Sequence, residues 1–171
     1  AKQEAIDKQY NALIAEADKL LASKSWDAAV TKYEEAKKVK ADPYPEQKIT
    51  EAKNAKKAEA DAAAQAEVDA NYQAVINEAD ALYKSKDWDG AITKYKEAQG
   101  IKSGESYPGE QITAAQNAKK AEADAAAQAE VDANYQAAIS EADVLYKSKD
   151  WDGAIAKYKE AQGIKAGESY P

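Results

Sequence analysis

The feature that most constrains this chain is an internal repeat with a period of about 63 residues, and a fixed period of such length indicates tandem structural units. Trp88 recurs as Trp151, and the stretch 54–74 recurs without change at 117–137. The first copy is more divergent. Its Trp26 lies one position closer to Trp88 than Trp88 does to Trp151, because the second copy has one more residue in the loop that follows.

Apolar residues step by three and four in two stretches of each period, as they do along one face of a helix. The two stretches of the third copy are separated by a turn at Lys149 and Asp150. The first stripe comprises Val131, Tyr135, Ala138, Ala142 and Leu145, and the second comprises Trp151, Ala154, Tyr158 and Ala161, with Ile155 beside it. Two such stripes predict a pair of helices packed against each other.

Turn residues predict where the helices begin and end. Asp87 can cap a helix, because its carboxylate can accept hydrogen bonds from amides of the first turn. Gly100 and Gly163, each followed by isoleucine, predict left-handed C-terminal caps. Pro45 and Pro108 fit the first position of the next helix, where no amide hydrogen is needed.

No turn cluster interrupts the stretch from about 108 to 149, so we expect one continuous helix of ~40 residues there, and a twin from about 45 to 86. The middle of each helix, at 54–71 and 117–134, is alanine-rich with alternating lysines and acids. Alanine removes little surface from water, so the sequence predicts helical spacers that are either exposed or loosely covered.

The sequence thus predicts an all-α fold of helix hairpins or three-helix units, joined by shared long helices into an elongated arrangement. The copies divide the chain into residues 1–44, 45–107 and 108–171. Each hairpin needs a cap, and the first turns after the proline, with Ile49 or Ile112, are the candidates. Tyr170-Pro171 repeats the start of a long helix, so we expect a fragment of a longer tandem array.

Small and aromatic residues alternate in each copy at spacings that resemble the tetratricopeptide repeat, the paired-helix motif of protein-binding solenoids. In the second copy they are Ala79, Trp88, Ala91, Tyr95 and Ala98. Two features of the chain depart from that family. Ser103 and Ala166 stand where the family has its closing proline, and the period of the chain is longer than the family's ~34 residues. Similar units occur in repetitive bacterial envelope and surface proteins, which favours the cell surface or periplasm over the cytoplasm. Localisation stays open.

The resemblance also implies a peptide-binding face on the first helix of each pair. It maps onto Gln73, Ile76, Asn77, Asp80, Tyr83 and Lys84, and onto Gln136, Ile139, Ser140, Asp143, Tyr146 and Lys147. The chain has no arginine there to form a carboxylate clamp. Aromatic residues at helical spacing are core in most proteins, so core packing is preferred over a ligand groove, and both alternatives stay open.

Composition excludes most other chemistry. The chain has no cysteine, histidine or methionine, which removes disulfides, the usual metal ligands and the usual general base, and no cofactor is expected. A net charge of −7 with interleaved lysines argues against nucleic acid, and no stretch is apolar enough for membrane insertion. Asp87-Trp88-Asp89-Gly90 resembles the start of a calcium loop, but position twelve is Ala98, so helix capping is the preferred interpretation.

These observations favour a non-enzymatic structural spacer or scaffold. The alternative is a module that binds a protein or peptide, and self-association is left open. An engineered repeat protein is a third hypothesis, although the drift from Val75 to Ala138 favours natural duplication.

Overall fold

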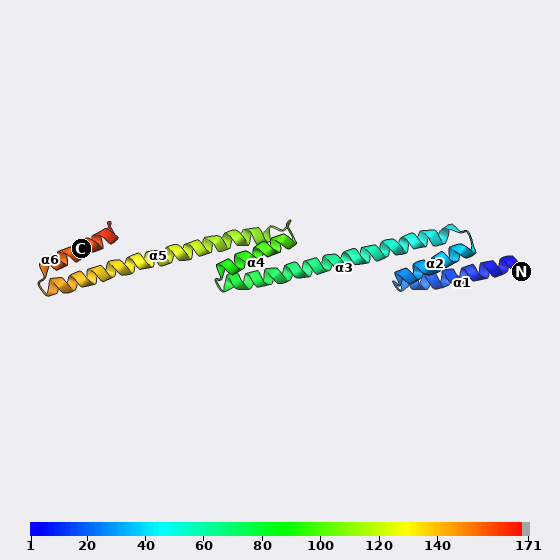
Figure 1. Cartoon of the computed structure of the whole chain (residues 1–171), viewed down its shortest axis with the longest axis horizontal. Helices are drawn as coiled ribbons and strands as arrows, with labels where there is room; N and C mark the ends of the chain where they lie inside the picture. Colours follow the sequence, from blue (N-terminus) through cyan, green and yellow to red (C-terminus); the bar gives the residue numbers. More distant parts are fainter. Residues whose placement is uncertain (169–171) are drawn as a thin grey trace. The chain divides into compact units, whose positions relative to one another are not determined.

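The computed structural model describes residues 1–168, which form six α-helices and no strand. The helices are α1 (Lys2–Ala22), α2 (Trp26–Val39), α3 (Pro43–Lys84), α4 (Trp88–Ile101), α5 (Tyr107–Lys147) and α6 (Trp151–Ile164) (Figure 1). The all-α fold is therefore confirmed. Tyr170 and Pro171, at which the sequence predicts a further long helix, lie outside the described residues.

The chain divides into two compact units, Ala1–Asn71 and Tyr72–Pro171. Three helix pairs lie within them. Hairpin 1 is formed by α1 and α2, hairpin 2 by residues 72–84 of α3 with α4, and hairpin 3 by residues 135–147 of α5 with α6 (Figure 1). Hairpin 1 belongs to the first unit, and hairpins 2 and 3 belong to the second.

Hairpin 2 has a core of small residues around one tyrosine. Ala79, Ala91 and Ala98 are fully buried, and Tyr95 is 1% exposed. Alanine lets the two helix backbones approach closely, and the tyrosine ring fills the space beside them. Most of the predicted apolar stripe is therefore core in this hairpin.

Hairpin 3 buries less of its predicted stripes. Ala142 and Ala161 are fully buried, but Val131 and Trp151 are exposed. Val131 lies in α5 before the stretch that pairs with α6, so no partner helix covers it. Trp151 lies at the start of α6, on a face that no described segment covers.

The first turns of α3 and α5 cap hairpins 1 and 2. We call residues 43–59 and 107–122 the cap segments. Ile49 joins the core of hairpin 1, and Ile112 packs on the core of hairpin 2, as the sequence predicts. Pro45 and Pro108 are fully buried. Their helices start at Pro43 and Tyr107, so the prolines occupy the third and second helical positions instead of the first, still within the turn that needs no amide donor.

The two long helices are continuous. α3 has 42 residues and α5 has 41, which confirms the predicted length. Every side chain from 56 to 71 and from 119 to 134 is exposed. Alanine's high helix propensity and side-chain pairs four residues apart support these segments, for example the ion pairs of Lys57 with Asp61 and Lys120 with Asp124, both at 2.6 Å.

The predicted left-handed glycine caps are wrong. α4 and α6 continue through Gly100 and Gly163 to Ile101 and Ile164, and no glycine among residues 1–168 has a positive φ. The physical reason lies in packing: the helix continues after Ala98 and thereby places Ile101 against the core of hairpin 2.

Three lysines at the hairpin turns adopt the left-handed conformation instead. Lys24, Lys86 and Lys149 have φ values of 59°, 62° and 66°. At the second turn, the amide of Lys86 donates to the Tyr83 carbonyl at 3.0 Å and the amide of Asp87 donates to the Leu82 carbonyl at 2.9 Å. This pair of hydrogen bonds is the Schellman arrangement that closes a helix and reverses the chain.

Candidate functional site

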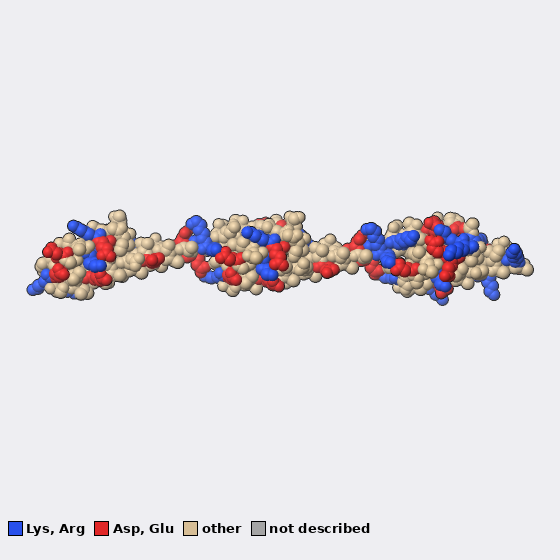
Figure 2. All heavy atoms as spheres, viewed as in Figure 1, with Lys and Arg blue, Asp and Glu red and all other residues tan. Residues whose placement is uncertain are grey.

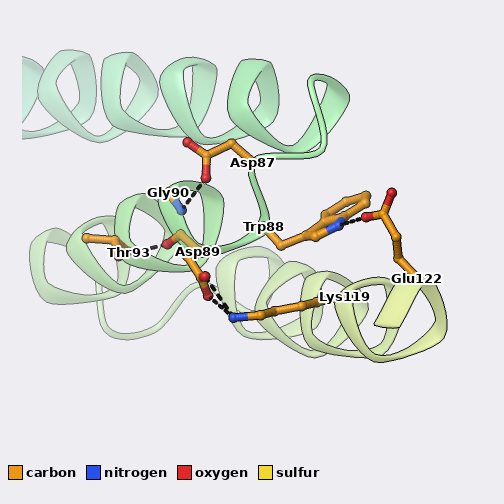
Figure 3. A network of polar contacts seen from close by, with 7 residues as sticks. All are labelled: Asp87, Trp88, Asp89, Gly90, Thr93, Lys119 and Glu122. Atoms are coloured by element: carbon orange, nitrogen blue, oxygen red, sulfur yellow. Dashed lines mark hydrogen bonds and ion pairs between the residues drawn. The ribbon is translucent and has the colours of Figure 1, made fainter. Parts of the chain in front are cut away.

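The start of α4 is organised by an aspartate cap (Figure 3). Asp87 Oδ1 accepts a hydrogen bond from the Gly90 amide at 3.0 Å, and Asp150 does the same for Gly153 at 3.1 Å. A Cβ on Gly90 would lie 2.5 Å from the Asp87 carboxylate, so a larger residue there would require the Asp87 side chain to move. The capping interpretation of the Asp-Trp-Asp-Gly sequence is confirmed.

Two contacts of charged side chains tie the cap segment of α5 to hairpin 2 (Figure 3). Lys119 Nζ lies 2.6 Å from Asp89 Oδ1, and Trp88 Nε1 donates to Glu122 Oε2 at 2.6 Å. Lys86 Nζ lies 3.4 Å from the other oxygen of Glu122. The Trp88 hydrogen bond, with the charge of Lys86, lowers the pKa of the Glu122 carboxyl from its usual value near 4.5.

The first unit contains the same junction between α2 and the start of α3. Trp26 Nε1 donates to Glu59 at 2.7 Å, Lys24 lies 3.1 Å from Glu59, and Lys56 lies 2.6 Å from Asp27. The pKa of Glu59 is lowered as well, chiefly by the Trp26 hydrogen bond. The same set of contacts thus closes both capped hairpins.

A half-buried carboxylate completes each junction. In hairpin 2, Asp80 Oδ1 accepts hydrogen bonds from the hydroxyls of Tyr95 at 2.6 Å and Tyr107 at 2.9 Å. The two rings meet edge to face with centroids 6.2 Å apart. Burial, and then the contact with Asp80, raises the pKa of Tyr95. In hairpin 1, Asp18 accepts from two tyrosine hydroxyls in the same way.

The structure places the candidate peptide-binding residues of hairpin 2 along α3. Gln73, Asn77 and Lys84 are exposed, and Gln73 Nε2 donates to Asn77 Oδ1 at 3.1 Å. Asp80 turns toward the two tyrosines, and Tyr83 is half-buried against Trp88, at a centroid distance of 5.2 Å. Ile76 is buried in the core. The polar members are therefore open to solvent, whereas Asp80, Tyr83 and Ile76 take part in packing.

Hairpin 3 presents the corresponding residues more openly. Gln136, Ser140 and Lys147 are exposed, and Ser140 Oγ donates to the Gln136 carbonyl at 2.8 Å. Tyr146 is exposed and meets Trp151 edge to face at 5.1 Å. Ile139 is buried, and Asp143 accepts from the Tyr158 hydroxyl at 2.6 Å.

Comparisons with protein-family models and with curated proteins found no match. No family therefore supplies a function for these residues.

Other kinds of site are not evident within residues 1–168. That range contains no group of three or more acidic residues arranged to hold a metal ion. None of its helices combines the length and apolar character needed to cross a bilayer. Lysines and acids are intermixed on the visible face of each unit (Figure 2).

The residues of the junctions are only partly visible to sequence reasoning. The sequence marks Asp87, Trp88 and Asp89 as the start of a helix. It gives no role to Lys119 and Glu122, which it places among the surface residues of the spacer. A signal for them exists, because a lysine and a glutamate occupy the equivalent positions 56 and 59 of the first long helix. Composition hides it, since alternating lysines and acids fill the whole segment.

Proposed function

We propose that this chain is a non-enzymatic structural repeat, a spacer or scaffold built from tandem hairpins on shared long helices. The observation that carries the proposal is the division of α5 into three parts. Its first part, residues 107–122, caps hairpin 2, its last part, residues 135–147, belongs to hairpin 3, and its middle is exposed on all sides.

Because the middle of α5 is helical, the length of the helix fixes the distance between the two ends of α5. A helix of 41 residues is about 60 Å long at 1.5 Å per residue. A flexible chain of the same length has a mean end-to-end distance of about 35 Å with a broad spread. The packing of both ends of α5 against hairpins and the high alanine content of its middle favour the helix over the flexible chain. The two ends are thereby held at a fixed distance, which is what a spacer supplies.

The packing of the hairpins supports a tetratricopeptide-like unit as part of this proposal. Alanines occupy the closest helix contacts, and one tyrosine fills the adjacent space, in keeping with the small and large positions of that repeat. The long period distinguishes this chain, because an exposed helical segment separates one hairpin from the next along α5.

The proposal is tested by a distance measurement across α5. The chain has no cysteine, so Glu110→Cys and Lys147→Cys place two spin labels without background. We expect a narrow distribution at ~55 Å, set by the helical rise between the two labelled positions. A broad distribution centred at ~35 Å, the value for a flexible chain, would contradict a spacer function.

A protein-interaction module is the second candidate, and one observation favours it. Hairpin 3 exposes Tyr146, Trp151 and Ile155 by 57%, 51% and 52%, whereas the equivalent residues of hairpin 2 are half-buried. Large exposed aromatic and branched side chains close together are typical of contact surfaces.

A further inference from the structure

The two ends of α5 pack through the same pattern of residues. At each end, three residues spaced by four and then three positions lie on one face of the helix and are buried or half-buried against a hairpin. They are Pro108, Ile112 and Ala115 at the end that caps hairpin 2, and Tyr135, Ile139 and Ala142 at the end that belongs to hairpin 3. Each residue of the second set follows its counterpart by 27 positions.

An offset of 27 residues corresponds to about seven and a half turns of an α-helix, since one turn takes 3.6 residues. The half turn means that the two packing faces point in opposite directions from α5. The ion pairs agree with this arrangement. Lys119 lies 2.6 Å from Asp89 of α4, and Asp132 lies 2.8 Å from Lys165 of α6. Lys119 and Asp132 are 13 positions apart, about three and a half turns, so hairpins 2 and 3 lie on opposite sides of α5.

The offset is kept where other lengths change. In α3, Ile49 precedes Ile76 by 27 positions, as Ile112 precedes Ile139 in α5. The spacer itself is unchanged between residues 54–71 and 117–134. The loop before each long helix is not held to one length, because the second copy has one residue more there than the first. The number of residues in the spacer is therefore constant although a neighbouring loop varies.

Packing within the chain does not account for this constancy. Every side chain from 119 to 134 is exposed, so an added alanine there would neither bury nor uncover a core residue. A longer alanine run would also remain helical. Each added residue would move hairpin 3 by only about 1.5 Å along α5 but would turn it by about 100° around the helix. The residue count thus affects the direction of hairpin 3 far more than its distance.

We propose that the spacer of α5 sets the direction in which hairpin 3 projects, in addition to its distance from hairpin 2. The half-turn offset holds the outer helices α4 and α6 on opposite sides of α5. Partners bound to the two hairpins would then be kept apart by the long helix. This inference rests on the proposed scaffold function and adds an angle to it.

The test changes the angle and the length separately, by inserting alanines between Ala126 and Ala127. Two added residues turn hairpin 3 by about 200°, which brings it to the side of hairpin 2, and lengthen α5 by only about 3 Å. Seven added residues make almost two full turns, keep hairpin 3 on its own side and lengthen α5 by about 10 Å. The seven-residue insertion is therefore the matched control.

Spin labels at Thr93→Cys and Ala156→Cys report the result, because these equivalent positions are exposed on α4 and α6. In the parent chain we expect a distance of about 50 Å, which combines the separation of the hairpins along α5 with their separation across it. The two-residue insertion should shorten this distance by about 10 Å, although the chain is longer. The seven-residue insertion should lengthen it by about 8 Å.

A label distance that grows with both insertions would overturn the proposal, because α5 would then set length alone. Circular dichroism gives a second reading. Both insertion variants should keep the helix content and the near-ultraviolet signal of the parent chain. If only the two-residue insertion unfolded hairpin 3, contacts and not the residue count would hold it on its side, which also contradicts the proposal. Failure of the scaffold function itself looks different: the labels at 110 and 147 would give a broad distribution in the parent chain.

Discussion

Three lysines adopt the backbone conformation that usually falls to glycine. Lys24, Lys86 and Lys149 end their helices with positive φ, and non-glycine residues lose roughly 1–2 kcal/mol there. The ion pair of Lys24 with Glu59 and that of Lys86 with Glu122 offset part of this cost. Lys149 lies at the turn of hairpin 3, where no cap segment among the described residues supplies such a glutamate.

Lys149→Gly is therefore expected to stabilise the protein. Removing the strained side chain should raise the free energy of unfolding of hairpin 3 by about 0.5–1 kcal/mol, which thermal denaturation followed by circular dichroism can detect. Lys147→Gly is the matched control, because it puts glycine into the last turn of α5 and should destabilise by a similar amount. A loss of stability in Lys149→Gly would show that the strain argument does not hold.

Residue-level reasoning from the sequence succeeded where the contact is local. The cap at Asp87 depends on an amide three residues away, so a short sequence motif reveals it. It failed at Gly100, because the helix continues there to bring Ile101 onto a core that only the folded hairpin creates. It could not pair Glu122 with Trp88, since these residues lie far apart along the chain.

At the scale of elements, the exposed middle of α5 has little tertiary support, since the ion pair of Asp132 with Lys165 at 2.8 Å lies at its end. Its exposed segment is held by propensity and by its anchored ends, so it should be sensitive to a single helix breaker. Ala126→Pro removes one helical hydrogen bond and clashes with the preceding turn, at a cost of roughly 3 kcal/mol to the continuous helix.

We expect this variant to uncouple the two ends of α5 without unfolding the hairpins. The distance between labels at 110 and 147 should shorten and broaden, while near-ultraviolet circular dichroism of the packed tyrosines should change little. Ala126→Ser is the control. An unchanged narrow distance in Ala126→Pro would mean that contacts outside α5 fix its ends.

The junctions between cap segments and hairpins should weaken in acid. Because the pKa of Glu122 is lower in the folded protein than its usual value near 4.5, its contribution to stability is present above about pH 4.5 and is lost as the pH falls toward the folded pKa. The same holds for Glu59. Thermal denaturation between pH 3 and 7 should show the loss.

Glu122→Gln isolates the effect. The variant should be less stable than the parent chain near neutral pH, and the difference should shrink below about pH 4.5, where the parent's glutamate is protonated as well. Glu130→Gln removes a charge from the exposed middle of α5 and serves as control. A difference that stays constant across this range would contradict the assigned role of the carboxylate.

Long elements were the most predictable part of the fold. The spacing of alanines and tyrosines marked both members of every hairpin, and the absence of turn clusters marked α3 and α5 as single helices. The capping role of Ile49 and Ile112 followed because each hairpin leaves one apolar face uncovered. What the sequence could not supply was the unequal burial of α4 and α6, because it arises from context and not from their residues.

For the molecule as a whole, stability should be distributed unevenly among the three hairpins. Hairpins 1 and 2 each have a cap segment, whereas no segment within residues 1–168 covers hairpin 3 in that way. Local opening is easiest where fewest apolar contacts are lost, so amides of α6 should exchange with deuterium at least about tenfold faster than those of α4.

Hydrogen exchange with mass spectrometry can measure both helices in one sample. Residues 94–101 and 157–164 have the same sequence, so the compared fragments must include a differing position, such as Thr93 or Ala156, to be told apart by mass. Equal protection of α4 and α6 would mean that the cap segment adds no stability.

The different partners beside the two buried prolines bear on how such a chain assembles. Nearly identical repeats are prone to mispair, because a segment can settle on the wrong copy while the chain is being made. Lys37 pairs with the carboxylate of Glu46, whereas a Cβ at Gly109 would lie 3.2 Å from Gln99 Nε2, so Gln99 favours glycine at that place. The first repeat thereby differs from the second at one pair of residues, which favours the correct cap segment on each of them during folding.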